Sequence, residues 1–192
     1  MRLDDELAAH VAALTQTVAG SGEVIDAVID RLCDCFAAGG KLLLAGNGGS
    51  AADAQHIAGE FVNRLAFDRP ALAAIALSTD SSVLTCVAND ACYERVFARQ
   101  VEALARPGDV LVGLTTSGRS GNVVEALTCA RRTGVLAVGF TGRAGGRLLA
   151  SVCDHVVAVA ADECVLIQEV HEFLWHRIVA AVEARLFGAV RV

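Results

Sequence analysis

The chain has 192 residues, of which 54% are hydrophobic and 20% are charged, and its formal net charge is −6. This length is enough for one domain with a full core, and no apolar run approaches the ~20 residues of a membrane span. The acidic balance argues against nonspecific nucleic-acid binding, and the first residues lack the apolar segment of a signal peptide. We therefore expect a cytoplasmic protein that has neither a membrane nor a nucleic acid as its partner.

Short apolar runs alternate with segments of helical periodicity along the chain. The first 38 residues predict two helices, at 3–19 and 23–38, which the Gly39-Gly40 pair ends. Strands are predicted at 41–46, 72–77, 109–114, 135–140 and 155–160. Further helices are predicted from about 50, at 81–88, at 93–105, from 120 to about 132, and from about 164 to 186. The glycine-rich residues 141–146 are expected to form a loop before a short helix.

Strands that alternate with helices imply a parallel sheet covered by helices on both faces. We therefore predict one α/β domain over residues 1–192, with a five-stranded core at 39–192. The helices of residues 1–38 lie outside this sheet, and the chain as a whole is apolar, with a mean hydropathy of +0.50. We expect these helices to be buried against other copies of the chain in a homo-oligomer.

Four residues from the two halves of the chain could form one site. His56 and Glu60 are four residues apart, and Gln168 and His176 are eight apart. Each pair therefore lies on one face of its predicted helix. Two imidazoles, a carboxylate and an amide oxygen suit a divalent metal ion, and they include a candidate general acid and a candidate general base.

Two polar turns follow predicted strands, where an open parallel sheet places its ligands. In the first, at 46–50, glycines would let the backbone approach a ligand, although Ser50 could simply cap the next helix. The second turn has four hydroxyls beside a helix start, those of Thr115, Thr116, Ser117 and Ser120. Hydroxyls, backbone N–H groups and a helix dipole together suit a phosphate monoester. The sequence therefore predicts a small phosphorylated ligand.

Other polar residues have simpler interpretations. His10 and His155 are interpreted as core histidines, and the Asn89-Asp90 pair could end a helix. His171 shares the last predicted helix with the candidate metal ligands and is a weaker candidate for a group that supports them.

In combination, these motifs resemble those of the phosphoheptose isomerases, which belong to the sugar isomerase (SIS) domain superfamily. The resemblance runs from about residue 39 to 188. It rests on Gly-Asn-Gly-Gly-Ser-Ala-Ala-Asp-Ala-Gln-His at 46–56, Asn-Asp at 89–90, Thr-Ser-Gly-Arg-Ser at 116–120 and Ile-Gln-Glu at 167–169. It implies a doubly wound SIS-type fold and conversion of D-sedoheptulose 7-phosphate to D-glycero-D-manno-heptose 7-phosphate. It also implies one zinc ion per subunit and a homotetramer with active sites between subunits.

The resemblance further implies roles for individual residues. The implied metal ligands are His56, Glu60, Gln168 and His176. The implied acid–base pair is Glu60 and His176. The implied sugar contacts are Asn47, Gly48, Gly49, Asn89 and Asp90, and Glu60 and Gln168 are also expected to touch the substrate. The implied phosphate contacts are Ser50, Thr115, Thr116, Ser117 and Ser120.

One departure and two alternatives accompany this interpretation. Leu166 stands where the family usually has Lys or Arg, so we expect the first turn of the last helix to pack differently. Some SIS relatives bind sugar phosphates without catalysis, and one that helps to assemble the replication initiation complex resembles this chain at residues 74–80. The presence of Glu60 and His176 favours an enzyme instead. The second alternative is an isomerase of another ketose phosphate, such as a pentose or hexose phosphate.

Overall fold

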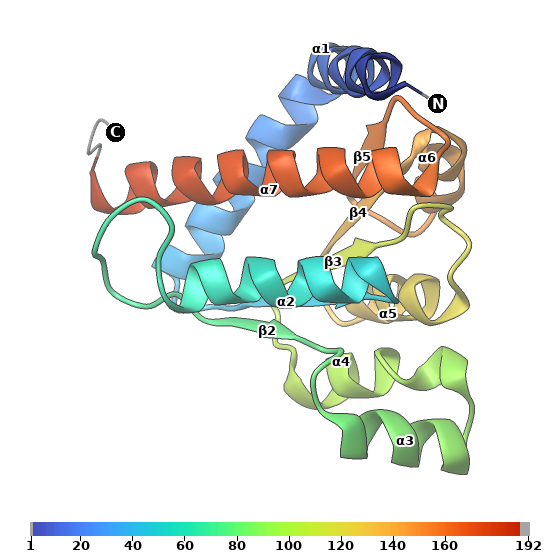
Figure 1. Cartoon of the computed structure of the whole chain (residues 1–192). Helices are drawn as coiled ribbons and strands as arrows, with labels where there is room; N and C mark the ends of the chain where they lie inside the picture. The colour runs from blue at the N-terminus through green and yellow to red at the C-terminus, as the bar shows by residue number, and fades with distance from the viewer. Residues whose placement is uncertain (1, 189–192) are drawn as a thin grey trace.

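The computed structural model describes residues 2–188 and contains a five-stranded parallel sheet with the strand order β2-β1-β3-β4-β5 (Figure 1). The strands are β1 (Leu42–Gly46), β2 (Ala74–Ala76), β3 (Val110–Leu114), β4 (Leu136–Gly142) and β5 (His155–Val159). All their pairings are parallel, as predicted from the alternation of strands and helices. The predicted α/β fold is therefore confirmed.

Helices connect the strands and cover both faces of the sheet. They are α1 (Leu3–Ala37), α2 (Gly49–Val62), α3 (Ser81–Asp90), the 3₁₀-helix η1 (Tyr93–Arg95), α4 (Ala98–Leu104), α5 (Gly121–Arg132), α6 (Arg143–Leu149) and α7 (Cys164–Phe187). No helix in the part of the chain that the structure describes is long and apolar enough to cross a membrane.

The core is divided by the sheet because alternate strand residues point to opposite faces. Leu42 and Leu44 of β1 pack with residues of α1, α2 and α7. Leu43 and Ala45 pack with residues of α4, α5 and α6 on the other face. Since every residue of β1 and β3 is buried, these central strands are apolar throughout.

The order of the strands places two turns side by side. The chain passes from β1 to β2 at one edge and then returns to β3 on the other side of β1. Gly46, the last residue of β1, pairs in register with Leu114, the last residue of β3. The turn after β1 and the loop after β3 therefore begin next to each other, at the switch point where such sheets bind ligands.

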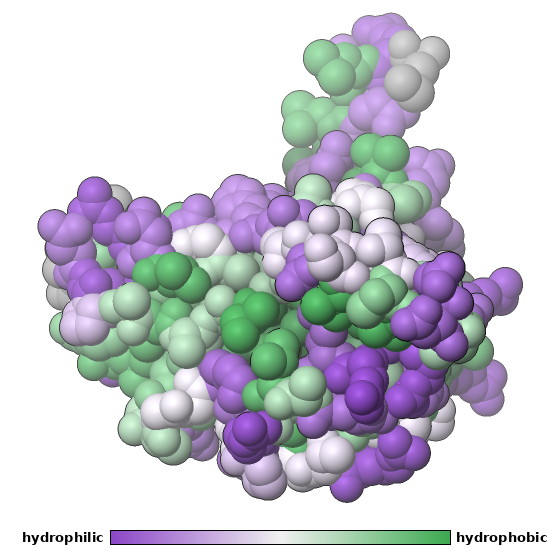
Figure 2. Space-filling model, turned by 90° about the horizontal axis from the view of Figure 1, so that it is seen from below, coloured by the Kyte–Doolittle hydropathy of each residue, from purple (hydrophilic) through white to green (hydrophobic). Residues whose placement is uncertain are grey.

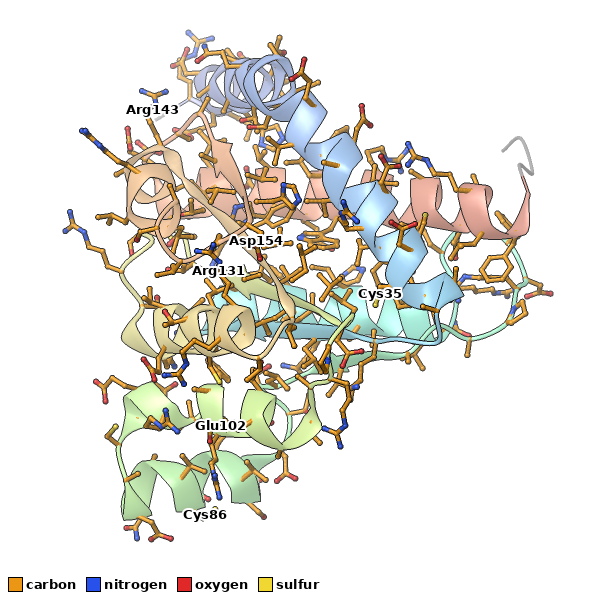
Figure 3. The ribbon with its side chains drawn as sticks, turned by 180° about the vertical axis from the view of Figure 1, so that it is seen from behind. Cys35, Cys86, Glu102, Arg131, Arg143 and Asp154 are labelled. Carbon is orange, nitrogen blue, oxygen red and sulfur yellow. The ribbon has the colours of Figure 1, made fainter. Side chains whose placement is uncertain are left out.

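The prediction of two N-terminal helices is wrong, because residues 3–37 form the single helix α1. Gly20 and Gly22 weaken the helix by about 1 kcal/mol each but do not end it. Thr17 and Ser21, on either side of Gly20, are buried, and Thr17 Oγ1 accepts a hydrogen bond of 3.0 Å from Ala160 N beyond β5. This packing supports the helix through its glycines, and Figures 1 and 3 show it bending instead of breaking.

Three further boundaries differ from the predictions. The helix expected at 93–105 is divided into η1 and α4, because Val96 and Phe97 turn inward between them and are buried. β2 is shorter than the predicted 72–77. The expected loop at 141–146 is the end of β4 followed by the start of α6. Gly145 is needed there for close packing, because a Cβ on Gly145 would clash with Thr141 Oγ1 and lie 2.9 Å from Gly118 N.

Candidate active site

Three of the four predicted metal ligands converge between α2 and α7. Glu60 Oε1 lies 3.1 Å from His56 Nε2, and His176 Nε2 lies 3.3 Å from the same nitrogen. One possible ligand atom from each of the three residues lies within 4.8 Å of the other two. The side chains of His56 and His176 are 45% and 34% exposed, so the cluster opens onto the surface of the single chain.

Helix packing brings the cluster together. α2 and α7 lie side by side across one face of the sheet (Figure 1), and Ile57 of α2 shares a core with Leu174 of α7. Their polar residues at four-residue spacing therefore meet along the seam between the two helices. His56 and Glu60 therefore lie on one face of α2, as predicted, and this face meets His176 of α7.

Gln168, the fourth predicted ligand, lies against the first turn of α2. Its Nε2 donates to Ser50 Oγ over 3.4 Å. A Cβ on Gly49 would come within 2.5 Å of the Gln168 Nε2, so a glycine is required for this approach. Gln168 thus lies beside the glycine turn. Ser50 is buried in the first turn of α2, whose N-cap is Gly48, so the simpler interpretation of Ser50 as the helix cap is wrong.

The hydroxyl-rich loop between β3 and α5 is folded tightly. Thr115 is buried, and its Oγ1 lies 2.9 Å from Ser120 Oγ. Ser117 Oγ accepts from Arg119 N over 3.2 Å, and Gly118 adopts a φ of +68° that reverses the chain. Thr116 is half-buried, with its Oγ1 3.5 Å from Cys164 Sγ at the start of α7. The loop therefore presents hydroxyls and backbone at the N-terminus of α5.

Sequence reasoning missed an amide network that joins the two turns. Asn47 and Asn122 exchange two hydrogen bonds of 2.9 Å, and Tyr93 Oη donates to Asn47 Oδ1 over 3.1 Å. Asn122 is the second residue of α5, and nothing in its local sequence pattern links it to Asn47. The pairing depends on the neighbouring ends of β1 and β3.

The Asn89-Asp90 pair lies apart from these contacts. Asn89 Nδ2 donates to Asp90 Oδ1 over 2.8 Å at the exposed end of α3. α3 has no buried residue, and Figure 1 shows it at the far side of α4 from the sheet. Among the described hydrogen bonds, none joins this pair to the other predicted site residues. Its expected sugar contact therefore stays a prediction.

Two carboxylates that the sequence analysis did not single out belong to the cluster. Glu172 lies four residues after Gln168 and four before His176, and this spacing could have identified it. Glu172 Oε1 is 2.9 Å from His56 Nδ1 and 3.4 Å from His176 Nε2. The pKa of Asp53 is raised to about 6, first by burial and then by the Glu172 carboxylate, while His56 acts to lower it. The site thus concentrates negative charge around two imidazoles.

A buried ion pair holds the end of α2. Arg69 and Glu183 have fully buried side chains, and Arg69 Nε donates to Glu183 Oε1 over 2.8 Å. Arg69 Nη2 also donates to the backbone oxygen of Glu60 over 2.8 Å. Glu183 accepts from the backbone N–H groups of Leu65 and Ala66 as well. The network therefore fixes the backbone that carries Glu60.

The remaining histidines lie outside the cluster. His171 is fully buried in the core, and its ring contacts Phe140 edge-on at 5.7 Å between centroids. Its expected role in supporting the metal ligands stays a prediction. His10, which was interpreted as a core residue, instead lies near the surface, 2.9 Å from Glu169 Oε2. His155 is half-buried at the start of β5 and lines the cavity described next.

A cavity of about 790 Å³ lies at the opposite end of the sheet, beside the first residues of β3, β4 and β5. Figure 3 shows Arg131, Asp154 and Cys35, which line it. Arg131 Nε is 3.1 Å from Asp154 Oδ1, so these charges neutralise each other. None of the predicted site residues lines this cavity. We place the functional site at the α2–α7 cluster because the candidate acid, base and metal ligands lie there.

Comparison with known proteins identifies the family that the chain resembles. A family model described as the SIS domain matches residues 7–142. A phosphoheptose isomerase of Desulfovibrio desulfuricans is 57% identical over 160 residues, which are 83% of this chain and 76% of that protein. One of Roseiflexus sp. is 50% identical over 183 residues, which are 95% of this chain and 92% of that protein. The structure of a phosphoheptose isomerase from Neisseria gonorrhoeae has a TM-score of 0.82 and 38% identity, and the match covers 95% of this chain and 100% of that one.

Proposed function

The chain belongs to the phosphoheptose isomerases of the SIS domain family, and from this premise we propose how its residues perform the reaction. The reaction converts D-sedoheptulose 7-phosphate, a ketose, to D-glycero-D-manno-heptose 7-phosphate, an aldose. It moves one proton between neighbouring carbons and one between their oxygens. It therefore needs an anchor for the phosphate and an acid–base pair at the reacting carbons.

The observation that carries the proposal is that the predicted acid and base lie close together, with ligand atoms within 4.8 Å of each other. Glu60 Oε1 and His176 Nε2 both lie within 3.3 Å of His56 Nε2, from helices more than 100 residues apart in sequence. In the proposed mechanism, Glu60 removes the proton from the carbon next to the carbonyl. His176 transfers the proton of the neighbouring oxygen, and an enediol forms between the two steps.

The phosphate is proposed to bind at the far end of the substrate. Ser50 and the loop of residues 115–120 supply hydroxyls and backbone N–H groups at the starts of α2 and α5. Asn47 and its glycine neighbours Gly48 and Gly49 are proposed to contact the sugar chain, together with Asn89 and Asp90. Anchoring both ends fixes the reacting carbons and lowers the entropic part of the barrier.

The cluster also fits a divalent metal ion. The imidazole nitrogens of His56 and His176 and the carboxylate of Glu60 are typical zinc ligands, and the amide oxygen of Gln168 could complete a four-ligand set. Buried oxygens of Asp53 and Glu172 that have no hydrogen bond add negative charge that a cation would balance. When bound, zinc would polarise the substrate carbonyl as a Lewis acid. We propose one ion per subunit.

We also propose that the active form is a homotetramer whose subunits share the active sites. The half-exposed His56 and His176 support this, because a neighbouring subunit would exclude water from the cluster. The cytoplasmic location expected from the sequence stays a prediction. The close relatives are isomerases, so they do not favour the alternative of a non-catalytic binding protein.

Substitution of the acid and the base tests the reaction. Glu60→Gln and His176→Asn should each lower turnover of sedoheptulose 7-phosphate by at least ~10²-fold, the usual contribution of one acid–base group. Substrate binding measured by calorimetry should change less. Ser117→Ala should instead weaken binding. A wild-type protein that binds this substrate without isomerising it, with or without added zinc, would contradict the proposal. Turnover of a pentose or hexose phosphate in its place would correct the substrate.

Elemental analysis tests the metal. Purified protein should contain about one divalent ion per subunit, and His56→Ala should lose most of it, since one of four ligands is removed. His10→Ala is the matched control, because His10 lies outside the cluster and should leave the metal content unchanged. Equal metal content in wild type and His56→Ala would argue against the site.

A further inference from the structure

Glu172 is a carboxylate beside the metal-ligand cluster. It takes no part in the proposed proton transfers, and the family resemblance gives it no role. We propose that Glu172 is a positioning residue, which accepts a hydrogen bond from His56 Nδ1–H and so leaves Nε2 of His56 unprotonated toward Glu60 and His176. This inference rests on the proposed function in one respect, namely that Nε2 of His56 is the atom that binds a cation.

The geometry around the His56 ring separates its two nitrogens. Nδ1 is 2.9 Å from Glu172 Oε1, whereas Nε2 is 3.1 Å from Glu60 Oε1 and 3.3 Å from His176 Nε2. A neutral imidazole carries its proton on one nitrogen, and the hydrogen bond made by that nitrogen decides which one. Carboxylates flank both nitrogens of His56, and the contact of Nδ1 with Glu172 is the shorter of the two. Because the buried oxygens of Glu172 have no other hydrogen bond, we assign the proton to Nδ1, and a cation bound at Nε2 would fix this arrangement.

The surroundings of Glu172 leave it few other partners. Both of its carboxylate oxygens are buried, and no aligned hydrogen bond reaches either of them. Among the described residues, the basic groups within 4.0 Å of Glu172 are His56 and His176, and no lysine or arginine pairs with it. Since a buried carboxylate without a donor is costly, a small rotation that aligns the Nδ1–H with Oε1 is favoured.

Glu172 supports the cluster from outside rather than ligating the cation itself. The set whose ligand atoms all lie within 4.8 Å of one another contains His56, Glu60 and His176 but not Glu172. Its place is that of the carboxylate which commonly accepts from the second nitrogen of a metal-bound histidine. The four-residue steps from Gln168 through Glu172 to His176 put all three on one face of α7.

The first test measures the tautomer of His56 in metal-free protein. Nitrogen-15 NMR of the imidazoles, at a pH where they are neutral, distinguishes a protonated Nδ1 from a protonated Nε2, and loss of the signal in His56→Asn assigns it. We expect the Nδ1–H form in wild type and a shift toward Nε2–H in Glu172→Leu. Glu172→Gln should restore the wild-type form, because its amide oxygen still accepts. Glu169→Gln, an exposed change on the same helix, should alter nothing.

The second test measures zinc affinity by competition with a chelator, without reference to activity. Glu172→Leu should weaken binding by about 10- to 100-fold, the usual effect of losing such a partner. Glu172→Gln should weaken it less, and Glu169→Gln should leave it unchanged.

The two tests distinguish failure of this proposal from failure of the proposed function. An Nε2–H tautomer in wild type, or a tautomer that Glu172→Leu does not alter, would overturn the role of Glu172 even in an active isomerase. The expected tautomer pattern in a protein that neither binds zinc nor turns over the heptulose phosphate would support the role of Glu172 and overturn the proposed function.

Discussion

His171 shows how one buried residue can make stability depend on pH. Its Nε2 lies 3.4 Å from the Thr141 oxygen, and its Nδ1 is buried without a partner. Burial lowers the pKa of His171 to about 4, although the Thr141 carbonyl acts to raise it. The folded protein therefore keeps this imidazole neutral at pH values where the unfolded chain, with an ordinary pKa of 6.5, has already bound a proton.

The sign of the effect follows from this difference. Between pH 6.5 and about 4 the unfolded state binds the extra proton, so the free energy of unfolding falls as the pH is lowered. The loss should amount to about 3 kcal/mol for wild type. Urea denaturation at several pH values should give a flatter profile for His171→Leu. Parallel profiles for the two proteins would show that His171 does not cause the acid sensitivity.

At the scale of elements, the Arg69–Glu183 pair joins α2, the connection to β2 and α7. Glu183→Leu leaves the buried guanidinium of Arg69 without its carboxylate and should lower the free energy of unfolding by about 3–5 kcal/mol. The double variant Arg69→Met/Glu183→Leu should recover part of this loss, because no unpaired charge remains. Urea denaturation measures both.

An exposed pair provides the control for this prediction. Arg64 and Asp68 form an ion pair on the surface of the same connection, and Asp68→Asn should change stability little. If Glu183→Leu were no more destabilising than Asp68→Asn, the buried network would not be what holds α2. Because Arg69 also bonds the backbone oxygen of Glu60, we expect the loss of Glu183 to reduce turnover in the folded protein as well.

At the scale of the whole molecule, α1 extends beyond the body of the protein. Figure 2 shows its N-terminal part projecting with apolar residues on its surface. Leu3, Leu7 and Val11 are 85%, 62% and 54% exposed and follow one another at four-residue steps. They lie on one stripe of the helix, the same stripe that Leu32 and Phe36 bury in the core further along. An apolar stripe of this kind fits a second copy of the chain.

Light scattering of Leu7→Glu/Val11→Glu tests this surface. The wild type should be a tetramer, and the double variant should dissociate, because charges would then be buried between subunits. Leu148→Glu, at an exposed apolar position on α6, is the control and should leave the mass unchanged. A monomeric wild type at micromolar concentration would contradict both the assembly and an active site shared between subunits.

The sequence by itself determined most of the local structure and indicated the residues that meet at the α2–α7 cluster. Apolar runs marked the five strands, and the four-residue step from His56 to Glu60 and the eight-residue step from Gln168 to His176 marked two helix faces. These inferences succeed because helical and strand periodicity depend on a few neighbouring residues. The four-residue spacing of Glu172 from Gln168 and His176 was visible in the sequence as well. Its role depends on His56 of α2, which lies opposite it in the structure.

Only the tertiary structure decided which distant residues meet. The strand order put the end of β1 beside the end of β3, so that Asn47 reached Asn122. Packing of α2 on α7 put Glu172 beside Nδ1 of His56 rather than Nε2. Burial of Thr17 and Ser21 kept α1 continuous through glycines that favour a break. In each case the free energy comes from contacts between segments far apart in the chain, which no local pattern records.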